Sequence, residues 1–516
     1  MVRLFDLQII HGDFYKALSQ GYTVGREAEG KRGEIYFKDG EPLAINMDWE
    51  LVYASPIEIE DKEGTANALA EALGLEKGVV LEQISQDNSY EAIKKKISKE
   101  ESEKIESLDL AGVYLASESG RYYPQEDFAS QLTGFVGAEG YGQYGLEGYY
   151  DNFLQPDQED QGDKLTLTID YSIQFKAESL LKEAKDNLNI DSGQIIVADP
   201  SSGKILAMAN YPNFNPNSYS QTDDFGVFQN ALTQKFFEPG SVFKPITMAI
   251  GIEEGKINPK TTYKDTGMVV VGGWPIYNYD HRVYSGDVTM TEVLEKSINT
   301  GAVFAESQIG NDVFLDYVDD FGFFEATGID IQEAYSENKE LKKGYDVNFA
   351  TAAFGQGIGI TPIQLIKAYC AIANGGKLVA PYIVEKIEQG ENVSIIEPET
   401  GMEVISQKTS SQVTGMMVSV VENGYSKAAK VSGYYVAGKT GTAQVPWSSL
   451  GVNEKGYSDK TWQSFIGFAP AFNPKFLILV KLDNPETKTA EYSAVPVFKK
   501  LAEYMLNYYQ IPPDYE

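Results

Sequence analysis

The chain has 516 residues, more than one hydrophobic core usually organises, so we expect two or more domains. Its apolar fraction of 42% is that of a globular protein. The formal net charge of −32, from 43 Lys and Arg against 75 Asp and Glu, excludes the basic surface that nucleic-acid phosphates require. We therefore expect no nucleic-acid partner and interpret the charge as a solvated acidic surface.

Few residues are available for disulfide, metal or histidine chemistry. Cys370 is the single cysteine, which excludes an internal disulfide, and its apolar neighbours indicate packing. The only histidines, His11 and His281, are too few for a histidine-based zinc site, so we expect no metal and no cofactor. We interpret His281 as structural.

The first part of the chain, residues 1–155, is expected to form one domain. It opens with an apolar periodic segment, residues 1–10, which fits a chain trimmed of an N-terminal membrane anchor and fits a native soluble start as well. No apolar run reaches the roughly 18–20 residues that span a bilayer. Two short apolar runs flank the turn Lys38-Asp39-Gly40 and predict a β-hairpin, whereas the Lys- and Glu-rich residues 86–108 predict a solvated helix.

A polar run at residues 156–163 predicts a linker to a second domain, residues 164–516. Alternating and helical patterns there predict six strands, three before and three after a region dominated by helices at residues 240–380, and a closing amphipathic helix. The fold class is therefore α+β, with an antiparallel sheet between helical layers. The predicted strands are residues 164–169, 194–199, 204–210, 434–445, 463–469 and 475–482, of which the first is short. The first and last helices predicted in this domain are residues 172–187 and 497–508.

The sharpest chemical motif is Ser241-Val242-Phe243-Lys244, preceded by Pro239-Gly240 and followed by Pro245. Proline is tolerated only in the first turn of a helix, so a helix must begin at or beside Ser241. Ser241 then lies among unpaired backbone N–H groups that favour developing negative charge. Lys244, three residues on, reaches the serine oxygen and can act as a base if burial or a second cation lowers its pKa. Alone, the pattern is weak, because a capping serine and a solvated lysine would explain it.

Two further motifs carry polar groups that suit proton relay and substrate binding. Ser297-Ile298-Asn299 follows a helical pattern and can present a hydroxyl for proton relay and an amide for a substrate carbonyl. Lys439-Thr440-Gly441-Thr442 lies in a predicted strand, so Lys439 and Gly441 share one face and the two threonines share the other. A glycine beside the lysine allows another backbone to approach closely. Taken alone, the first of these motifs is better explained as the end of a helix, and the second as an edge strand with a solvated lysine.

Two glycine patterns imitate nucleotide sites. Residues 433–440 match the spacing of a phosphate-binding loop, but the residues before Lys439 are strand-like and those after it are a poor helix start. We reject ATP binding there. Gly355-Gln356-Gly357-Ile358-Gly359 precedes a predicted helix at Thr361-Pro362, and we interpret it as a tight connection.

The three motifs, in this order, are those of penicillin-binding proteins and class A β-lactamases. Over nearly its whole length the chain resembles the class B penicillin-binding proteins, which are peptidoglycan D,D-transpeptidases. Arg32-Gly33-Glu34-Ile35 and the segment from Asp39 to Ala44 look like the family's N-terminal signature, with Phe37-Lys38 where an Asp-Arg pair is usual. The Asn299 form of the second motif is closer to the division-type branch. Other matching segments are Arg121-Tyr122-Tyr123-Pro124, Gly134-Phe135-Val136-Gly137, Gly145-Leu146-Glu147-Gly148 and Pro496-Val497-Phe498-Lys499.

The resemblance implies an elongated N-terminal pedestal of the dimerisation type and a penicillin-binding transpeptidase domain. It implies that Ser241 is the nucleophile toward a D-Ala-D-Ala stem peptide, that Lys244 is the base and that Ser297 relays the proton. Lys439 would supply a positive field, Asn299 would orient the substrate, and Thr440, Gly441 and Thr442 would bind it. β-Lactams would acylate Ser241. Family members work outside the membrane that anchors them, beside a membrane glycosyltransferase and division proteins.

Two other functions remain open from the sequence. A D,D-carboxypeptidase or β-lactamase would share Ser241, Lys244 and Lys439 but would hydrolyse the ester. No E-x-x-L-N segment lies between the second and third motifs to carry the deacylating carboxylate of class A enzymes. A non-catalytic scaffold of wall synthesis is the second alternative.

Overall fold

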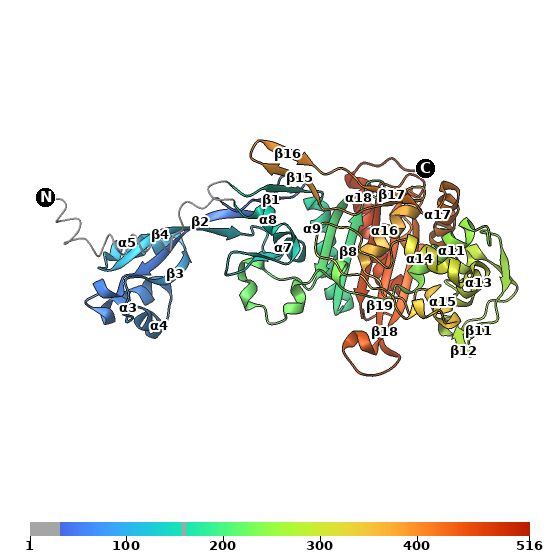
Figure 1. The fold of residues 1–516 in the computed structure, drawn as a ribbon, viewed down its shortest axis with the longest axis horizontal. Helices are drawn as coiled ribbons and strands as arrows, with labels where there is room; N and C mark the ends of the chain where they lie inside the picture. The colour runs from blue at the N-terminus through green and yellow to red at the C-terminus, as the bar shows by residue number, and fades with distance from the viewer. Residues whose placement is uncertain (1–30, 157–160) are drawn as a thin grey trace.

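The computed structural model describes residues 31–156 and 161–516, and these form an elongated molecule with a small N-terminal lobe at one end and a large α/β body at the other (Figure 1). The apolar segment predicted at residues 1–10 lies outside the described residues. Within the described ranges, none of the helices combines the length and apolarity that a membrane crossing requires.

The N-terminal lobe is built on the long strand β2, which pairs antiparallel with β3 and β4. Helices α3, α4 and α5 cover one face, and their apolar side chains form a separate core with those of the strands. The predicted hairpin is confirmed, because β1 pairs with β2 across the predicted turn. The elements are β1 (Ile35–Tyr36), β2 (Pro42–Ala54), α3 (Lys62–Leu73), α4 (Lys77–Gln83), β3 (Glu91–Ile97), α5 (Lys99–Leu108) and β4 (Val113–Tyr122).

The helix predicted over residues 86–108 is wrong in its first half. Residues 91–97 form the strand β3, with Ile93 and Ile97 buried in the lobe's core. Pairing with β2 supplies contacts that outweigh the helix propensity of Lys and Glu, which is a weak preference. The helix α5 begins only at Lys99, where Ser98 and Glu101 form a capping box.

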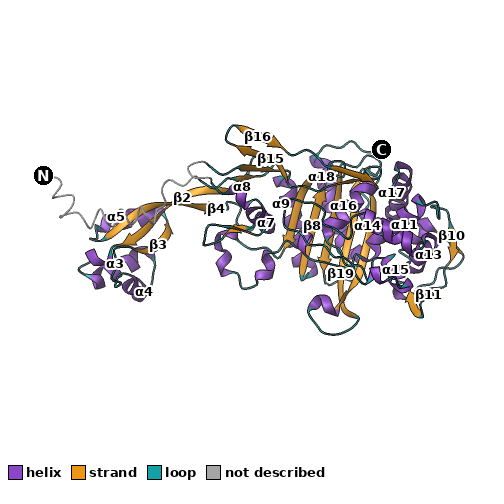
Figure 2. Cartoon of the chain, in the orientation of Figure 1, coloured by secondary structure: helices purple, strands orange, loops and turns teal. Residues whose placement is uncertain are grey.

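The large body contains a five-stranded antiparallel sheet in the order β18-β19-β20-β8-β9. Helices α9 and α18 pack on one face, and α11, α16 and α17 belong to the core on the other (Figure 2). The predicted fold of a sheet between helical layers is therefore confirmed. The strands are β8 (Ser192–Ala198), β9 (Ile205–Tyr211), β18 (Ala437–Pro446), β19 (Tyr457–Ala469) and β20 (Phe476–Asp483); the helices are α9 (Tyr171–Leu188), α11 (Lys244–Glu253), α16 (Pro362–Ala373), α17 (Gln407–Glu422) and α18 (Ala494–Tyr508).

Helices dominate residues 240–380, as predicted, but short strands also occur there. Two small hairpin-like pairs, β10 with β13 and β11 with β12, interrupt the helices between residues 262 and 289. The strands are β10 (Thr262–Lys264), β11 (Met268–Val271), β12 (Trp274–Tyr277) and β13 (Asp287–Thr289); the further helices are α12 (Met290–Glu295), α13 (Asn299–Ile309), α14 (Asn311–Asp320) and α15 (Asp346–Ala352).

The two parts of the chain share a sheet. Strand β7, the predicted first strand of the second domain, pairs parallel with β1 and antiparallel with β15, which pairs with β16. The linker predicted at 156–163 and the domain bounds stay predictions, since residues 157–160 lie outside the described residues. The remaining elements are α6 (Ser130–Thr133), β5 (Phe135–Val136), β6 (Gly142–Gln143), α7 (Gly145–Tyr149), α8 (Asp151–Leu154), β7 (Lys164–Leu167), α10 (Ala231–Gln234), β14 (Lys377–Val379), β15 (Val384–Gln389), β16 (Asn392–Ile395) and β17 (Thr400–Glu403).

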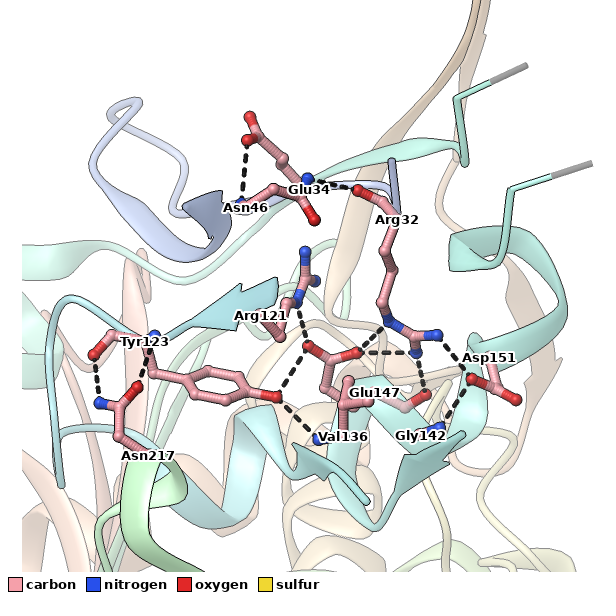
Figure 3. A network of polar contacts seen from close by, with 10 residues as sticks. All are labelled: Arg32, Glu34, Asn46, Arg121, Tyr123, Val136, Gly142, Glu147, Asp151 and Asn217. Carbon is pink, nitrogen blue, oxygen red and sulfur yellow. Dashed lines mark hydrogen bonds and ion pairs between the residues drawn. The ribbon is translucent and has the colours of Figure 1, made fainter. Parts of the chain in front are cut away.

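A buried ion network joins the segment before β1 and the strand β4 to the short helices α7 and α8 (Figure 3). The Glu147 side chain is completely buried; Arg32 donates to it at 2.8 Å and Arg121 at 2.6 Å. Arg32 also pairs with Asp151 at 2.8 Å. The hydroxyl of Tyr123 donates to Glu147 at 3.3 Å. All of these residues except Asp151 belong to the segments that carried the family resemblance, and together they connect the base of the N-terminal lobe to α7 and α8.

Removing the Glu147 carboxylate should destabilise this junction. Glu147→Ala leaves two buried guanidinium groups with one carboxylate between them, which is expected to cost about 3–5 kcal/mol. Thermal unfolding followed by circular dichroism measures the loss. Asp48→Ala, which removes the exposed Lys31–Asp48 pair, is the control and should change the melting curve little. Equal melting curves for the two variants would show that the network does not support the junction.

Candidate active site

Ser241 and Lys244 lie on one helical turn. A single 3₁₀ turn, Gly240–Phe243, leads directly into α11, and Pro245 occupies the first turn as expected. The α-helix proper therefore begins three residues after the serine. Lys244 is fully buried, and its Nζ lies 3.0 Å from the Oγ of the partly accessible Ser241.

The second motif lies between two helices. Ser297 follows α12 with a positive φ of 54°, and Asn299 is the first residue of α13. The turn between the two helices places three oxygen atoms next to Lys244. Nζ of Lys244 lies 2.7 Å from the Ser297 carbonyl oxygen, 3.4 Å from its Oγ and 2.8 Å from Oδ1 of Asn299.

The third motif is the edge strand β18. Lys439 is buried and its Nζ lies 2.9 Å from Oγ of Ser297, which completes a chain of polar contacts from Ser241 through Lys244 and Ser297 to Lys439. Thr440 and Thr442 are partly exposed on the other face, as the alternation predicted. A Cβ added to Gly441 would lie 2.9 Å from the carbonyl oxygen of Pro239. Glycine is therefore required where the turn Gly240–Phe243, which carries the candidate nucleophile Ser241 and is called the nucleophile turn below, packs on the strand.

The glycine-rich connection after α15 supports the same turn. Gly355 has a φ of 81°, and its carbonyl oxygen accepts a 2.9 Å hydrogen bond from the N–H of Gly240. A Cβ on Gly355 would lie 2.2 Å from the carbonyl oxygen of Gly240. The tight connection predicted here is thus part of the wall behind Ser241. The structure agrees with the rejection of a phosphate-binding loop at residues 433–440. Such a loop would lead into a helix at the lysine, whereas Lys439 and the residues after it continue as strand β18.

Burial sets the charge state of the two lysines. Desolvation, and then the nearby charge of Lys439, hold the pKa of Lys244 well below its ordinary value. Desolvation lowers the pKa of Lys439 to about 7. A neutral Lys244 amine beside a serine hydroxyl is able to accept its proton, which a solvated lysine at neutral pH is not. In the described ranges, no group of three or more His, Cys, Asp and Glu side chains is placed to hold a metal ion.

A buried network behind the second motif was missed from the sequence. Asp265 accepts hydrogen bonds from Thr300 Oγ1 at 2.7 Å and from Asn278 Nδ2 at 3.0 Å. Asn278 in turn accepts from the N–H of Thr300 at 3.0 Å. The adjacent Tyr277 carbonyl accepts from Nδ2 of Asn299 at 3.0 Å, which fixes which way the amide points. No strand was predicted within residues 262–289, and no local signal placed Asp265 beside Thr300.

His281 borders this network, and its backbone N–H donates to the Asn278 carbonyl at 3.1 Å. It is exposed, and its ring packs edge-on against Tyr277 at 4.6 Å between centroids. Cys370 is buried in α16, in agreement with a packing role.

Removing the Asp265 carboxylate should disturb the second motif while the sheet stays intact. Asp265→Ala leaves the donors of Asn278 and Thr300 without an acceptor, so Asn299 and Ser297 lose their support; we expect acylation by benzylpenicillin to slow about 10- to 100-fold, at about 1.4 kcal/mol per decade. The rate is measured by intact mass spectrometry. Asp287→Ala, an exposed carboxylate of the same segment, is the control. A normal rate for Asp265→Ala would mean that the motif is held without it.

Family models match both parts of the chain. The penicillin binding protein transpeptidase domain matches residues 193–503, and the penicillin-binding protein dimerisation domain matches residues 27–165. The matched transpeptidase region covers more than half of the chain and contains all three motifs. The chain therefore belongs to the penicillin-binding protein transpeptidase family, and its two-domain type is class B.

Individual relatives are similar to this chain over nearly its full length. Stage V sporulation protein D of Bacillus subtilis is 34% identical, over 94% of this chain and 79% of the relative. Peptidoglycan D,D-transpeptidase FtsI of Escherichia coli is 28% identical, over 95% of this chain and 85% of the relative. The crystal structure of penicillin binding protein 2X from Streptococcus thermophilus superposes with a TM-score of 0.77 at 23% identity, covering 93% of this chain and 79% of that one. The resemblance seen in the sequence and the fold that it implied are both confirmed.

Proposed function

We propose that this protein is a serine-type peptidoglycan D,D-transpeptidase that cross-links stem peptides through an acyl-enzyme on Ser241. The observation that carries the proposal is the buried Lys244 amine, which lies within 3.0 Å of the Ser241 hydroxyl. Family membership and the names of the relatives support the same activity.

In the first step, Ser241 Oγ attacks the carbonyl carbon of the penultimate D-Ala and gives its proton to Lys244. The new C–O bond pushes the carbonyl electrons onto oxygen, where the backbone N–H groups of Ser241 and Thr442 stabilise the charge. The tetrahedral intermediate collapses and the C–N bond breaks. The leaving amine takes a proton by way of Ser297, whose Oγ lies between the two lysines, and D-alanine departs.

The remaining motif residues bind and orient the substrate. Lys439 provides a positive field toward the terminal carboxylate, and the hydroxyls of Thr440 and Thr442 donate to it. The amide of Asn299 holds a substrate carbonyl. In the second step an amine of a neighbouring stem peptide attacks the ester, loses its proton to Lys244 and releases Ser241, which forms the cross-link.

The cellular setting is a further part of the proposal. Stem peptides lie outside the cytoplasmic membrane, so the catalytic domain is expected to work on the extracytoplasmic side as part of a membrane-anchored protein, beside a membrane glycosyltransferase. The Asn299 motif and the segment Pro496-Val497-Phe498-Lys499 favour a role in septal synthesis with division proteins. The name of the Bacillus relative adds spore formation as a second setting for the same chemistry.

Benzylpenicillin distinguishes the proposed activity from its alternatives. We expect a stable covalent adduct with the mass of the whole drug, because opening the β-lactam ring leaves no departing fragment. Ser241→Ala should form none, and intact mass spectrometry measures both. Rapid loss of the adduct with turnover of the drug would indicate a hydrolase instead. An unmodified wild-type protein would indicate a scaffold and contradict the proposal.

The pH profile of acylation tests the two lysines. The pKa of Lys439 near 7 means that its positive charge is lost as the pH rises through 7, so the rate constant for acylation should fall on the alkaline side. In Lys439→Arg the guanidinium stays charged, and the alkaline limb should shift upward by at least two pH units even if the overall rate is lower. Stopped-flow acylation with a chromogenic cephalosporin measures both profiles. An unchanged alkaline limb in Lys439→Arg would assign the titration to another group.

A further inference from the structure

Strands β15 and β16 form a hairpin that extends from the upper side of the molecule in Figure 1, near the junction of the lobe and the body. In the described sheet that joins these two parts, β16 is the terminal strand and pairs with β15 alone. All of its residues are exposed. One edge of β16 is therefore open, and an open edge is a template to which another strand can add.

The backbone hydrogen bonds show which groups lie at the open edge. The N–H of Ile396 donates to the carbonyl oxygen of Glu385 in β15 at 2.9 Å. Backbone groups alternate in direction along a strand, so Ser394 also faces β15, whereas Val393 and Ile395 direct their N–H and C=O groups away from it. Among the described residues, no strand pairs with those groups. The open edge thus offers donors and acceptors at the spacing that an added antiparallel strand requires.

The side chains of β16 are distributed in the opposite way to those of an ordinary solvated strand. Val393 is 54% exposed and Ile395 is 64% exposed, and both lie on the open face of the sheet. The polar Ser394 lies on the other face, opposite Ile387, which packs against the core. Natural edges are usually protected by charged residues or proline, and residues 392–396 contain neither. Exposed apolar side chains along a free edge indicate an interaction surface.

Acidic residues flank this apolar segment on both sides. Glu391 precedes it, and Glu397 and Glu399 follow it; all three are exposed. Within the described ranges none of them forms an ion pair, whereas Glu388 of the neighbouring strand pairs with Lys386 at 3.1 Å. By the alternation of the strand, Glu391 and Glu397 lie on the same face as the two apolar side chains. The charge around β16 therefore favours a basic occupant.

A second copy of this chain fits the edge poorly. Two β16 strands paired antiparallel about Ser394 place Glu391 of one copy opposite Glu397 of the other at both ends of the pairing. Like charges that lie directly opposite each other destabilise a sheet. The net charge of −32 adds a general repulsion between copies.

We propose that the free edge of β16 binds an extended segment of a partner protein by strand addition, and that this segment has a basic residue at each end and apolar residues between. The basic side chains lie opposite Glu391 and Glu397, and the apolar ones lie beside Val393 and Ile395. The added strand extends the sheet in which β7 joins β1 of the lobe to β15. The surface is separate from the catalytic centre, so the inference does not depend on the reaction at Ser241.

A synthetic peptide of this chemistry tests the surface on the full chain. The probe is fluorescein-labelled Lys-Thr-Val-Thr-Val-Thr-Lys, in which the valines lie opposite Ile395 and Val393 and the lysines opposite the two glutamates. The matched probe has glutamate in place of both lysines. In fluorescence polarisation at low salt we expect the lysine probe to bind at least about tenfold more tightly. The difference should shrink at about 0.5 M NaCl, because salt screens exposed charges.

Two variants separate the charges from the backbone edge. Glu391→Lys/Glu397→Lys should reverse the preference between the two probes, whereas Glu103→Lys/Glu106→Lys, the same change in charge at exposed positions of α5, should leave it unaltered. Ile395→Pro removes an N–H of the open edge and keeps those that face β15, and proline is tolerated at such edge positions. It should weaken binding of the lysine probe by about tenfold or more.

Equal affinities for the two probes, or a preference that survives in Glu391→Lys/Glu397→Lys, would overturn the proposal. A wild-type chain that sediments as a dimer and becomes monomeric in Ile395→Pro would make a second copy the occupant and would overturn it as well. Acylation by benzylpenicillin, measured on each variant, reports whether the body is folded. If Ile395→Pro loses acylation it is misfolded, and the exchange of charges at Glu391 and Glu397 then decides the outcome.

Discussion

A single buried amine organises the catalytic centre. Nζ of Lys244 contacts Oγ of Ser241, two oxygens of Ser297 and Oδ1 of Asn299, all within 3.4 Å. A charged ammonium could satisfy the same contacts, but burial and the neighbouring Lys439 oppose the charge. The site therefore combines dense hydrogen bonding with a low proton affinity of the amine, which is what the proposed role of Ser241 as nucleophile requires.

The surrounding parts of the large body exclude water from that amine and hold its hydrogen-bond partners in position. Sheet strand β18 supplies Lys439 and a glycine surface on which the nucleophile turn lies, and Gly355 packs its backbone against the other side of that turn. The network around Asp265 holds the second motif from behind. Because interiors are close-packed, each of these supports restricts the others.

The N-terminal lobe is connected to the body by shared strands as well as by side chains. Strand β7 links β1 to β15, so the sheet that begins in the lobe ends on the body. Beside it the buried Glu147 network ties the lobe's strands to α7 and α8 (Figure 3). Backbone pairing and buried ion pairs thus both connect the lobe to the rest of the chain.

The sequence by itself determined what depends on near neighbours. The proline that requires a helix start, the three-residue spacing of Ser241 and Lys244 and the alternation around Lys439 each act within one turn or one strand, and the structure has them as predicted. Tertiary structure alone decided what depends on remote segments. It brought Ser297 to Lys244 across 53 residues and to Lys439 across 142, and it turned residues 91–97 into a strand against their helix propensity. It also buried the two lysines, and desolvation, which shifts their pKa values, is a property of the surrounding packing that no local pattern encodes.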